Sequence, residues 1–532
     1  MIKNPPLTPQ VGELEIAIKH ANELAHAGEF QKAVNHCLQS LLEFGEQAGF
    51  LKILGSIAFN QKNIAHAIEF YERATKASPA DALSWAGLGM AYGVDDQTTK
   101  AIVALRNCVD LKPQTPVPYL NLAMAMMKAQ KFTGALDVLK PASELFPDFL
   151  PFRIWLGHCY SSLDQGGEAR GIYKQIATQN SDDLSVLLPL ALLERDRGEI
   201  EESSKCLEKI LQHQPDHPVA NFTYAQNLLI SGDLKAGFAR YENRWDRDGM
   251  IRPNLKSPLW RGEGLAGKKI LVYAEQGFGD AIQFVRYLTQ LKAMGATVQL
   301  KAHPRLHKIL STLGQIDQFI TKDEEEDADY NIAMMSLPHY LNTTIDTIPN
   351  DIPYLRANER LVERWCGRLN ELGGDAKLKV GLVWQGDPNS QSEKGRSVPF
   401  ENLKMLFDIK NIHFFLIQKQ DGLNQLQDIV LPENVSDLGP ELDLGADAFV
   451  DTASVMTCLD IVISSDTSPA HLAGALGCKT WVMLKYIPEW RWLLGRDDSP
   501  WYPTAILFRQ HETGNWAEVI QKIKSLLNEQ CQ

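Results

Sequence analysis

Small and apolar residues recur at a step of 34 along the first half of the chain. Two sets of small residues follow this step, twelve positions apart, and an apolar residue precedes most members of the first set. A helix-turn-helix repeat needs this pattern, because small residues let its two helices approach closely and proline ends the second helix. We therefore predict seven helical repeats over residues 14–250, in preference to a non-repetitive helical bundle. The first set is Ala21, Gly55, Gly89, Ala123, Gly157, Ala191 and Ala225, the second is Ala33, Ala67, Ala101, Ala135, Ala169, Ser203 and Gly237, and the prolines are Pro79, Pro113, Pro147 and Pro215.

The array resembles the tetratricopeptide repeats. This resemblance implies a superhelix of stacked helix pairs with a concave groove, which usually holds a peptide or an unfolded segment. The first repeat lacks the terminal proline, and we interpret it as a cap. A protein partner in the groove is expected by analogy, because arrays of this kind bind many different partners.

After Trp245 the pattern changes to short apolar runs that alternate with helical stretches. Strands spaced in this way indicate parallel sheets built from βαβ units. We predict an α superhelix followed by an α/β region, with two Rossmann-like lobes at residues 251–370 and 371–515. A closing helix at 516–532 could pack on either lobe. The predicted strands lie at 268–274, 296–302, 329–335, 378–384, 412–418, 459–465 and 479–485.

Ligands of such sheets bind beyond the carboxyl ends of the strands, and one candidate loop there runs from Glu275 to Asp280. Gly277 and Gly279 permit a tight turn and a close approach of the backbone to a ligand. Asp280 stands at the start of the next helix, where its carboxylate could cap that helix. A cap and a catalytic residue are both open interpretations of Asp280.

A second candidate loop runs from Ser464 to His471, after the strand at 459–465. Ser468 as N-cap and Pro469 as the first helical residue predict a helix start. The free N–H groups and the positive end of the helix dipole would form an anion site suited to a diphosphate. The alternative is a plain helix cap with a buried His471.

The two loops, Gly279-Asp280 and Asp466 to His471, resemble those of heptosyltransferase-type glycosyltransferases of the GT-B fold, over residues 265–510. The resemblance implies a general base at Asp280 and a nucleotide-sugar site at ten further residues. No metal is expected, and no other cofactor. The ten are Gly277, Gly279, Arg396, Gln418, Lys419, Asp466, Thr467, Ser468, Pro469 and His471.

The tails at 488–496 and 499–503 resemble bacterial proteins that fuse tetratricopeptide repeats to this transferase domain. Some of those proteins are thought to glycosylate flagellin or other proteins, so flagellin is one candidate acceptor. The domain order is also similar to that of the O-linked N-acetylglucosamine transferases, whose catalytic motifs match less well. Two departures leave the donor sugar open: Ser468-Pro469 stands where glycine is usual, and Ala281-Ile282-Gln283 where a histidine is frequent.

The chemistry of glycosyl transfer fits these residues. Transfer needs a base for the acceptor hydroxyl and stabilisation of the departing diphosphate. No Asp-x-Asp stands at a strand end, so we predict metal-independent transfer, and we interpret the acidic run Asp323–Asp327 as a solvated loop. The leading hypothesis is an inverting glycosyltransferase whose repeats recruit a protein acceptor. The alternatives are a catalytically degenerate repeat scaffold, or a transferase acting on a glycolipid or small molecule.

Composition limits the classes of partner and the cellular compartment that we expect for this protein. The net charge of −13 argues against nucleic-acid binding, which needs a cationic surface. The eight cysteines form no CxxC pair and are interpreted as small buried hydrophobes in a reducing compartment, not as disulfides or a zinc site. The chain has no apolar run of 18 residues and no signal-peptide core, so we expect a cytoplasmic protein without a membrane span.

The aromatic residues near the end of the second lobe have two interpretations, core packing or a surface that stacks on a sugar or an acceptor. Trp490 and Trp492 alternate around Arg491, so these three side chains are not expected to face inward together. The other two members of the group are Trp501 and Tyr502.

Overall fold

The computed structural model describes residues 11–179, 184–247, 249–321, 327–390 and 393–531. The chain forms two compact units, residues 1–193 (unit 1) and 194–532 (unit 2). Among the described residues no helix is both long and apolar enough to cross a membrane.

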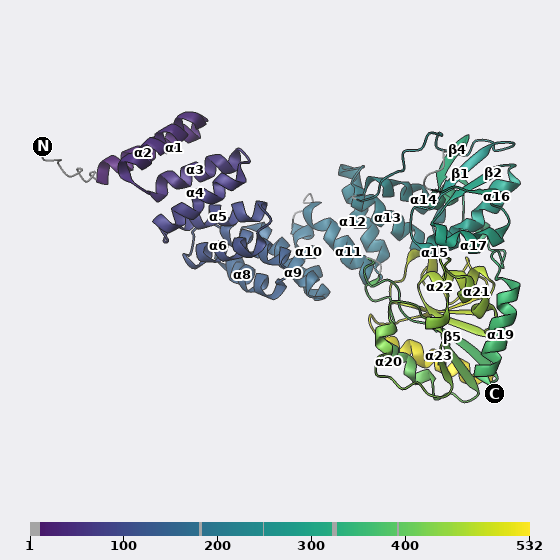
Figure 1. Ribbon diagram of the computed structural model, residues 1–532. Coiled ribbons are helices and arrows are strands. Elements are labelled where there is room, and N and C mark those ends of the chain that lie inside the picture. Colours follow the sequence, from purple (N-terminus) through teal and green to yellow (C-terminus); the bar gives the residue numbers. More distant parts are fainter. Residues whose placement is uncertain (1–10, 180–183, 248, 322–326, 391–392, 532) are drawn as a thin grey trace. The chain divides into compact units, whose positions relative to one another are not determined.

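Unit 1 consists of antiparallel helix pairs, each packed against the next (Figure 1). Its core lies within and between the pairs, and the predicted small residues lie where the two helices of a pair approach each other. A Cβ on Gly89 would stand 2.4 Å from the Leu105 side chain, and one on Gly157 would stand 2.5 Å from the Tyr173 ring. These glycines therefore set the closest approach of two paired helices. The helices are α1 Val11–His26, α2 Phe30–Phe44, α3 Ala48–Asn60, α4 Ile64–Ala77, α5 Ala82–Val94, α6 Thr98–Asp110, α7 Val117–Lys128, α8 Phe132–Leu145, α9 Leu150–Ser162 and α10 Gly166–Gln179.

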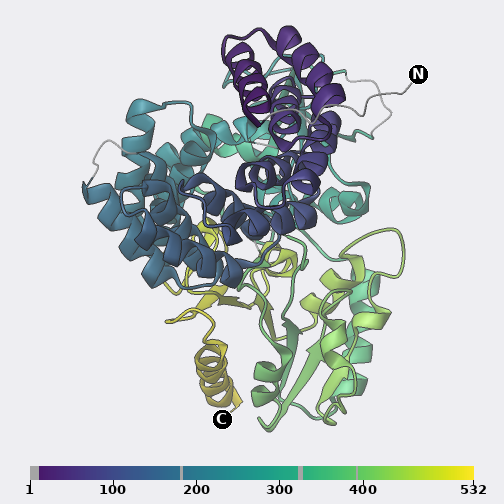
Figure 2. The ribbon, with the colours of Figure 1, turned by 90° about the vertical axis from the view of Figure 1, so that its left-hand side faces the viewer.

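Two further pairs continue this pattern, α11 (Leu187–Asp196) with α12 (Ile200–His213), and α13 (Pro218–Ile230) with α14 (Leu234–Tyr241). Within unit 1 the pairs from α1 to α10 are stacked one on the next (Figure 2), and by chain order α11 to α14 bring the helical pairs among the described residues to the seven predicted. The division into compact units falls inside α11, not near residue 250. The reason is packing: α13 and α14 bury Leu229, Phe238 and Tyr241 in the same core as the first sheet.

The first sheet of unit 2 has four parallel strands in the order β3-β2-β1-β4. Strands β1, β2 and β4 match predicted runs, whereas the two-residue β3 was not predicted. The first helices of this lobe are short. The strands are β1 Lys269–Tyr273, β2 Thr297–Lys301, β3 Gln318–Phe319 and β4 Tyr330–Ala333, and the helices are α15 Phe278–Phe284, α16 Leu288–Ala293, α17 His307–Leu310 and α18 Leu337–Tyr340. The next helix, α19 (Glu359–Gly373), packs against elements of the second sheet's lobe.

The second sheet has six parallel strands in the order β10-β9-β8-β5-β6-β7. Its four predicted strands are confirmed, and β7 and β10 are added at the two edges. The sheet is buried on both faces, and α23 packs on one of them with Trp516, Ile520 and Ile523. The closing helix therefore belongs to the second lobe. The elements are β5 Leu378–Val383, α20 Phe400–Leu403, β6 Ile412–Leu416, β7 Val435–Asp437, α21 Val450–Thr457, β8 Ile461–Ser465, α22 Ser468–Ala475, β9 Thr480–Leu484, β10 Ala505–Arg509 and α23 Trp516–Cys531.

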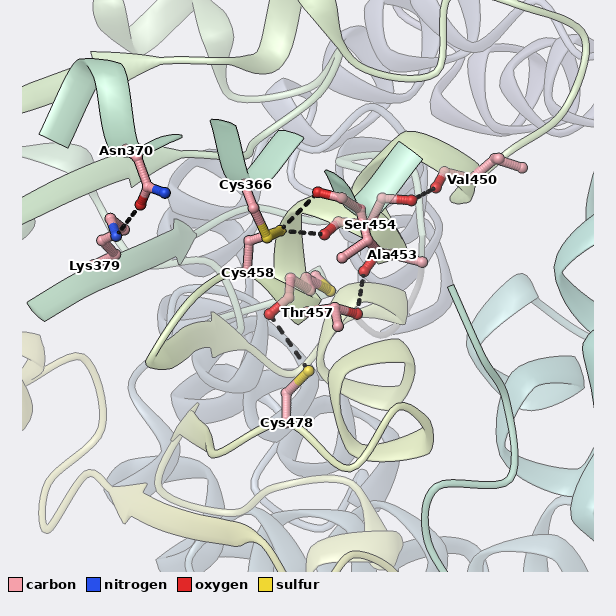
Figure 3. The surroundings of a disulfide bond; sticks show 11 residues. Cys366, Asn370, Lys379, Val450, Ala453, Ser454, Thr457, Cys458 and Cys478 are labelled. Atoms are coloured by element: carbon pink, nitrogen blue, oxygen red, sulfur yellow. Dashed lines mark hydrogen bonds between the residues drawn. A yellow bond between two sulfur atoms is a disulfide. The ribbon is translucent and has the colours of Figure 1, made fainter. Parts of the chain in front are cut away.

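The expectation that no cysteine forms a disulfide is wrong for one pair. Cys366 on α19 is bonded to Cys458, which follows α21, with an S–S distance of 2.06 Å (Figure 3). The two residues are 92 positions apart, and the packing of α19 on α21 brings them together. Cys37, Cys108 and Cys159 form no disulfide and are buried, as expected.

The aromatic residues of the second lobe form core, and the expected alternation around Arg491 is wrong. Trp490, Arg491 and Trp492 form a single 3-10 turn, η12, and all three are buried. Consecutive side chains in such a turn diverge by about a third of a turn, unlike those of a strand, which point to opposite faces. The turn can therefore bury three neighbouring side chains in one core, where Trp501 and Tyr502 also lie.

Candidate functional site

The candidate loops follow strands at the points where strand order reverses in each sheet. In the second sheet β5 and β8 are neighbours although they are the first and fourth strands of that lobe, and the loops at Trp384 and Asp466 follow them. In the first sheet the corresponding neighbours are β1 and β4, followed by the loops at Glu275 and Met334. Ligands of open parallel sheets bind at such points, outside the carboxyl ends of the strands.

The two predicted loops meet each other. A Cβ on Gly279 would stand 3.0 Å from the His471 ring and 3.4 Å from Ser468, so only a glycine allows this approach without displacement. Helix α22 begins one residue earlier than predicted. Its N-cap is Thr467, with extended backbone, and Ser468 and Pro469 are the first residues of the helix.

Asp280 uses both carboxylate oxygens within the protein. Oδ2 accepts a hydrogen bond from the backbone N–H of Gly277 at 3.0 Å, which makes Asp280 a helix-capping residue. Oδ1 forms an ion pair with Arg491, 211 positions away. The side chain keeps 21% of its surface exposed, so a substrate hydroxyl can still approach it.

Arg491 is the partner of Asp280 that sequence reasoning missed. Its Nε donates to Gln283 Oε1 at 2.8 Å, one of its amino groups lies 3.3 Å from Glu489 Oε2, and its guanidinium lies over the Trp490 ring. A charged residue between two tryptophans is the signal that could have identified it, since a buried cation requires a buried partner.

His471 is buried in α22 beside these residues. Its Nδ1 lies 3.0 Å from the Tyr502 hydroxyl, and its ring stacks on Trp492. Burial holds the pKa of His471 well below its usual range, and the nearby cations Arg491, Arg286 and Arg396 act in the same direction. His471 is therefore neutral at pH 7 and offers one ring nitrogen as a donor and one as an acceptor.

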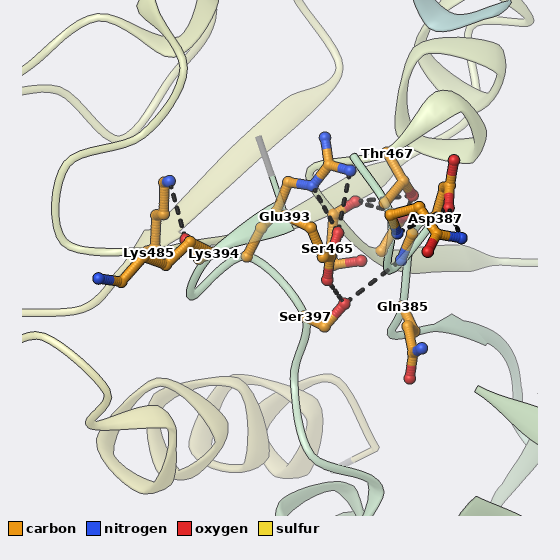
Figure 4. Close-up of polar contacts among 12 residues, drawn as sticks. Gln385, Asp387, Glu393, Lys394, Ser397, Ser465, Thr467 and Lys485 are labelled. Atoms are coloured by element: carbon orange, nitrogen blue, oxygen red, sulfur yellow. Dashed lines mark hydrogen bonds and ion pairs between the residues drawn. The ribbon is translucent and has the colours of Figure 1, made fainter. Parts of the chain in front are cut away.

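Arg396 lies next to the start of α22. Its guanidinium donates to Glu393 Oε2 at 3.0 and 3.2 Å, and Glu393 also accepts from Ser397 (Figure 4). A Cβ on Gly386 would stand 2.7 Å from Arg396 and 3.1 Å from Thr467, so both residues line the same glycine. Asp466 is buried at this point, and burial raises the pKa of its carboxyl.

Gln418 and Lys419 hold backbone segments in place. Gln418 is buried, and its amide accepts from Trp384 N and donates to Gln385 O, both at 2.9 Å. The ammonium of Lys419 donates to the carbonyls of Leu442 and Asp443. These contacts brace the loops after β5 and β7 around the candidate site, and Gln418 in particular has its polar atoms occupied.

Glu275 is a second residue, after Arg491, whose part in the site sequence reasoning missed. It begins the first candidate loop, but no role was predicted for it. Its side chain is 6% exposed and contacts Arg244 at 2.9 Å. Burial raises the pKa of Glu275 to about 7, against the opposing effect of Arg244. A buried carboxyl that titrates near neutrality, five residues before Asp280, is typical of a functional site.

Among the described residues, His, Cys, Asp and Glu form no group of three suited to a metal ion. Within the predicted acidic loop, residues 323–326 lie outside the described part of the chain. Asp327 is exposed and forms an ion pair with Lys269.

Comparison with known proteins identifies the repeats. Residues 18–82 and 126–190 match family models described as tetratricopeptide repeat. Similar solved structures include YrrB, a TPR protein with an unusual peptide-binding site, at 19% identity, a TM-score of 0.32, and coverage of 35% of this chain and 95% of that one. Another is MamA, at 22% identity, a TM-score of 0.30, and coverage of 32% and 92%. The family models thus show tetratricopeptide repeats at residues 18–82 and 126–190.

One relative matches beyond the repeats. Protein FlbA of Caulobacter vibrioides is 24% identical over 435 residues, which are 77% of this chain and 72% of that protein. Because that length exceeds either compact unit, the similarity covers parts of both.

Proposed function

We propose that the protein is a glycosyltransferase of GT-B type that moves a sugar from a nucleotide-sugar donor to a protein acceptor recruited by the repeats. The observation that carries the proposal is the meeting of Gly279 with Ser468 and His471, where strand ends of both sheets converge. One lobe brings a carboxylate, Asp280, to this junction. The other brings a helix start flanked by guanidinium groups, which suits a diphosphate.

The donor side follows from the charges around α22. The helix start contributes partial positive charge, and Arg396 lies against Thr467 across Gly386. In the proposed complex these groups stabilise the negative charge that develops on the leaving diphosphate, which is metal-independent electrostatic catalysis. His471, neutral at pH 7, can donate one hydrogen bond to a phosphate oxygen.

The acceptor side follows from Asp280. A carboxylate has about four lone-pair positions, so its bonds to Gly277 and Arg491 leave room for a substrate hydroxyl. In an inverting transfer this carboxylate takes the hydroxyl proton as the acceptor oxygen attacks the anomeric carbon. The competing candidate function is a binding scaffold without catalysis. The observation that favours a scaffold is that both carboxylate oxygens of Asp280 already have partners within the protein, Gly277 and Arg491.

The test of the proposal is thermal unfolding of the full chain in the presence of single sugar nucleotides. A ligand at 100 times its dissociation constant adds about 2.7 kcal/mol to the stability of the unit that binds it. We expect one nucleotide class to raise the melting temperature and the bare nucleoside to do so less. If no sugar nucleotide stabilises the protein, the proposed donor site is wrong.

Replacing Arg396 with alanine is expected to weaken donor binding about 10- to 100-fold, because one charge-assisted bond of roughly 1.5–3 kcal/mol is lost. The change also leaves Glu393 without its cation beside the proposed phosphates. Calorimetry measures the affinity. Lys404→Ala is the matched control, since Lys404 pairs with an exposed glutamate on α20. Wild-type affinity in the Arg396 variant would remove this residue from the site.

The repeats supply a surface for the acceptor. A cavity of about 520 Å³ lies among α5, α7 and α9 and is lined by Met90, Val94, Met124 and Trp155. Helices α3, α5, α7 and α9 carry no Asp or Glu, in a chain with a net charge of −13. The side-chain amide of Asn121 also lines the cavity. This chemistry suits an apolar segment of an acceptor protein whose backbone bonds to the amide.

A charge in this cavity is expected to impair protein modification without affecting donor chemistry. Met124→Glu places a carboxylate among apolar residues and should raise KM for the protein acceptor by 10-fold or more, given roughly 1.5–3 kcal/mol for an apolar side chain of this size. Leu42→Glu is the control, because Leu42 is 89% exposed on α2, outside the cavity. Equal KM values in the two variants would argue that the acceptor binds elsewhere.

A further inference from the structure

The residues after α14 include a buried arginine, Arg244, which contacts the loops at the carboxyl ends of β1 and β4. Arg244 lies in the 3-10 turn η2 (Glu242–Asp246) and has a fully buried side chain. One amino group donates to Glu242 Oε1 at 2.7 Å, and the other donates to Glu275 Oε1 at 2.9 Å and Ser336 Oγ at 2.7 Å. Arg244 therefore ties the last helical pair to the loops that follow β1 and β4.

Glu275 connects the same two loops from the other side. Its Oε1 accepts from Arg244 and from the backbone N–H of Met335 at 3.3 Å. Its Oε2 is buried, without a hydrogen-bond partner among the described residues. Removing Arg244 would leave this carboxyl without its cation, at a cost that either moves the loop or keeps the carboxyl protonated.

The next residue in the loop is held by the same helical pair. Gln276 donates to the hydroxyl of Tyr241, the last residue of α14, at 3.0 Å. One residue further, the N–H of Gly277 is the group that binds Asp280. The orientation of the Asp280 carboxylate thus depends on a segment that Arg244 and Tyr241 hold in place.

The other partner of Asp280 is supported from the same side. Helix α13 packs against the η12 turn that carries Arg491, and the rings of Phe238 and Tyr241 pack against Trp490 with centroids 5.4 and 6.3 Å apart. Both groups that hold Asp280, the Gly277 N–H and Arg491, therefore lie on segments in contact with α13, α14 or η2.

We infer that the seventh repeat is a working part of the catalytic site, in which Arg244 and Tyr241 are positioning residues that hold the Glu275–Gly277 segment and so orient Asp280. The inference rests on the proposed function. It gives the last repeat a role separate from acceptor binding. Neither residue needs to touch the donor or the acceptor.

The ionisation of Glu275 supplies a readout that a purely structural role would not move. The charged or titratable groups that interact with it are Arg244 from η2, Tyr273 from β1 and Asp280 from α15, and Glu242 from η2 shares Arg244 with it. The pKa of Glu275 lies at about 7, so above that pH the carboxyl is ionised. Its ion pair with Arg244 is therefore strongest above pH 7. We expect kcat to rise through this pH range.

The experiment compares full-length Arg244→Met, Arg244→Lys, Glu275→Gln and Tyr241→Phe with wild type, in kcat, donor affinity and pH profile. Arg244→Met is expected to lower kcat about 10- to 100-fold at unchanged donor affinity, since small displacements of a catalytic group cost this much. In this variant the rise of kcat near pH 7 should shift to higher pH, because Arg244 lowers the pKa of Glu275. Glu275→Gln should lack the rise of kcat near pH 7. Arg244→Lys should have a higher kcat than Arg244→Met, because it keeps the positive charge.

Lys292→Met is the matched control, because it breaks an ion pair with Asp317 at the amino end of β2, away from the strand ends that carry the site. It is expected to leave kcat and the pH profile unchanged. Tyr241→Phe removes a single hydroxyl and keeps the inference testable if Arg244→Met does not fold. Wild-type kcat and pH profile in all of the Arg244, Glu275 and Tyr241 variants would overturn the inference.

Amide hydrogen exchange separates this inference from the proposed function. Arg244→Met should speed exchange at residues 275–280, and Lys292→Met should not. If wild type transfers no sugar, the proposed function fails, whereas unchanged exchange at 275–280 in folded Arg244→Met protein refutes the positioning role by itself.

Discussion

Sugar transfer by Asp280→Asn protein is expected to be about 10²–10⁴-fold slower than transfer by wild type, with donor affinity nearly unchanged. Asparagine keeps the size of the side chain, and its carbonyl oxygen can still accept from the Gly277 N–H. It cannot take a proton from the acceptor hydroxyl. The rate should therefore fall while the helix cap and the donor site remain.

Single-turnover kinetics with saturating donor measures this loss, and calorimetry measures donor affinity. Asp233→Asn is the matched control, because Asp233 caps α14 by accepting from Ala236 N at 3.1 Å, and asparagine is an equally good cap. If Asp280→Asn transfers sugar at the normal rate, Asp280 is a cap and the base lies elsewhere.

Deleting residues 1–193 is expected to abolish modification of the protein acceptor while slow hydrolysis of the sugar nucleotide persists. Binding an acceptor on the same chain raises its effective concentration at the site, to millimolar values for short flexible connections. The cut removes unit 1 and leaves α12 to α14, whose apolar residues share a core with the first sheet. The truncated chain should therefore retain both sheets.

Circular dichroism checks that the truncated chain is folded, and hydrolysis and protein transfer are then compared with the full chain. Loss of transfer alone assigns acceptor selection to unit 1. Equal transfer by both chains would mean that unit 1 does not select the acceptor, and the repeats would then act in assembly.

The features that could be predicted from sequence are those with a local or periodic cause. The seven helical pairs follow from small residues every 34 positions, because helix crossings need them. The central strands follow from apolar runs buried on both faces. The short strand β3 and the edge strands β7 and β10 carry a weaker pattern, since an edge strand such as β10 leaves Ile506 partly exposed. Each candidate loop could be placed at the carboxyl edge of its own sheet, because parallel strands share that edge, whereas the contact between the two loops depends on how the two sheets pack.

The features that sequence reasoning missed depend on contacts between distant residues. Arg491 is 211 positions from Asp280, and Cys366 is 92 positions from Cys458. The sequence around one partner does not show which distant residue it meets, even where a charged residue between two tryptophans indicates that a partner is needed. The contacts of Gln418 and Lys419 with backbone atoms have the same origin: a side chain of suitable type was recognised, but the carbonyls that occupy it come from other loops.

The central claim is sugar transfer to a protein, and one labelling measurement tests it most directly. The full chain is incubated with the protein fraction of its own cells and a sugar nucleotide labelled in the sugar, chosen by its thermal stabilisation. The account predicts label in protein, one nucleoside diphosphate released per sugar transferred, and loss of both signals with Asp280→Asn. Label that stays on the nucleotide, or that moves only to lipid or water, would contradict it.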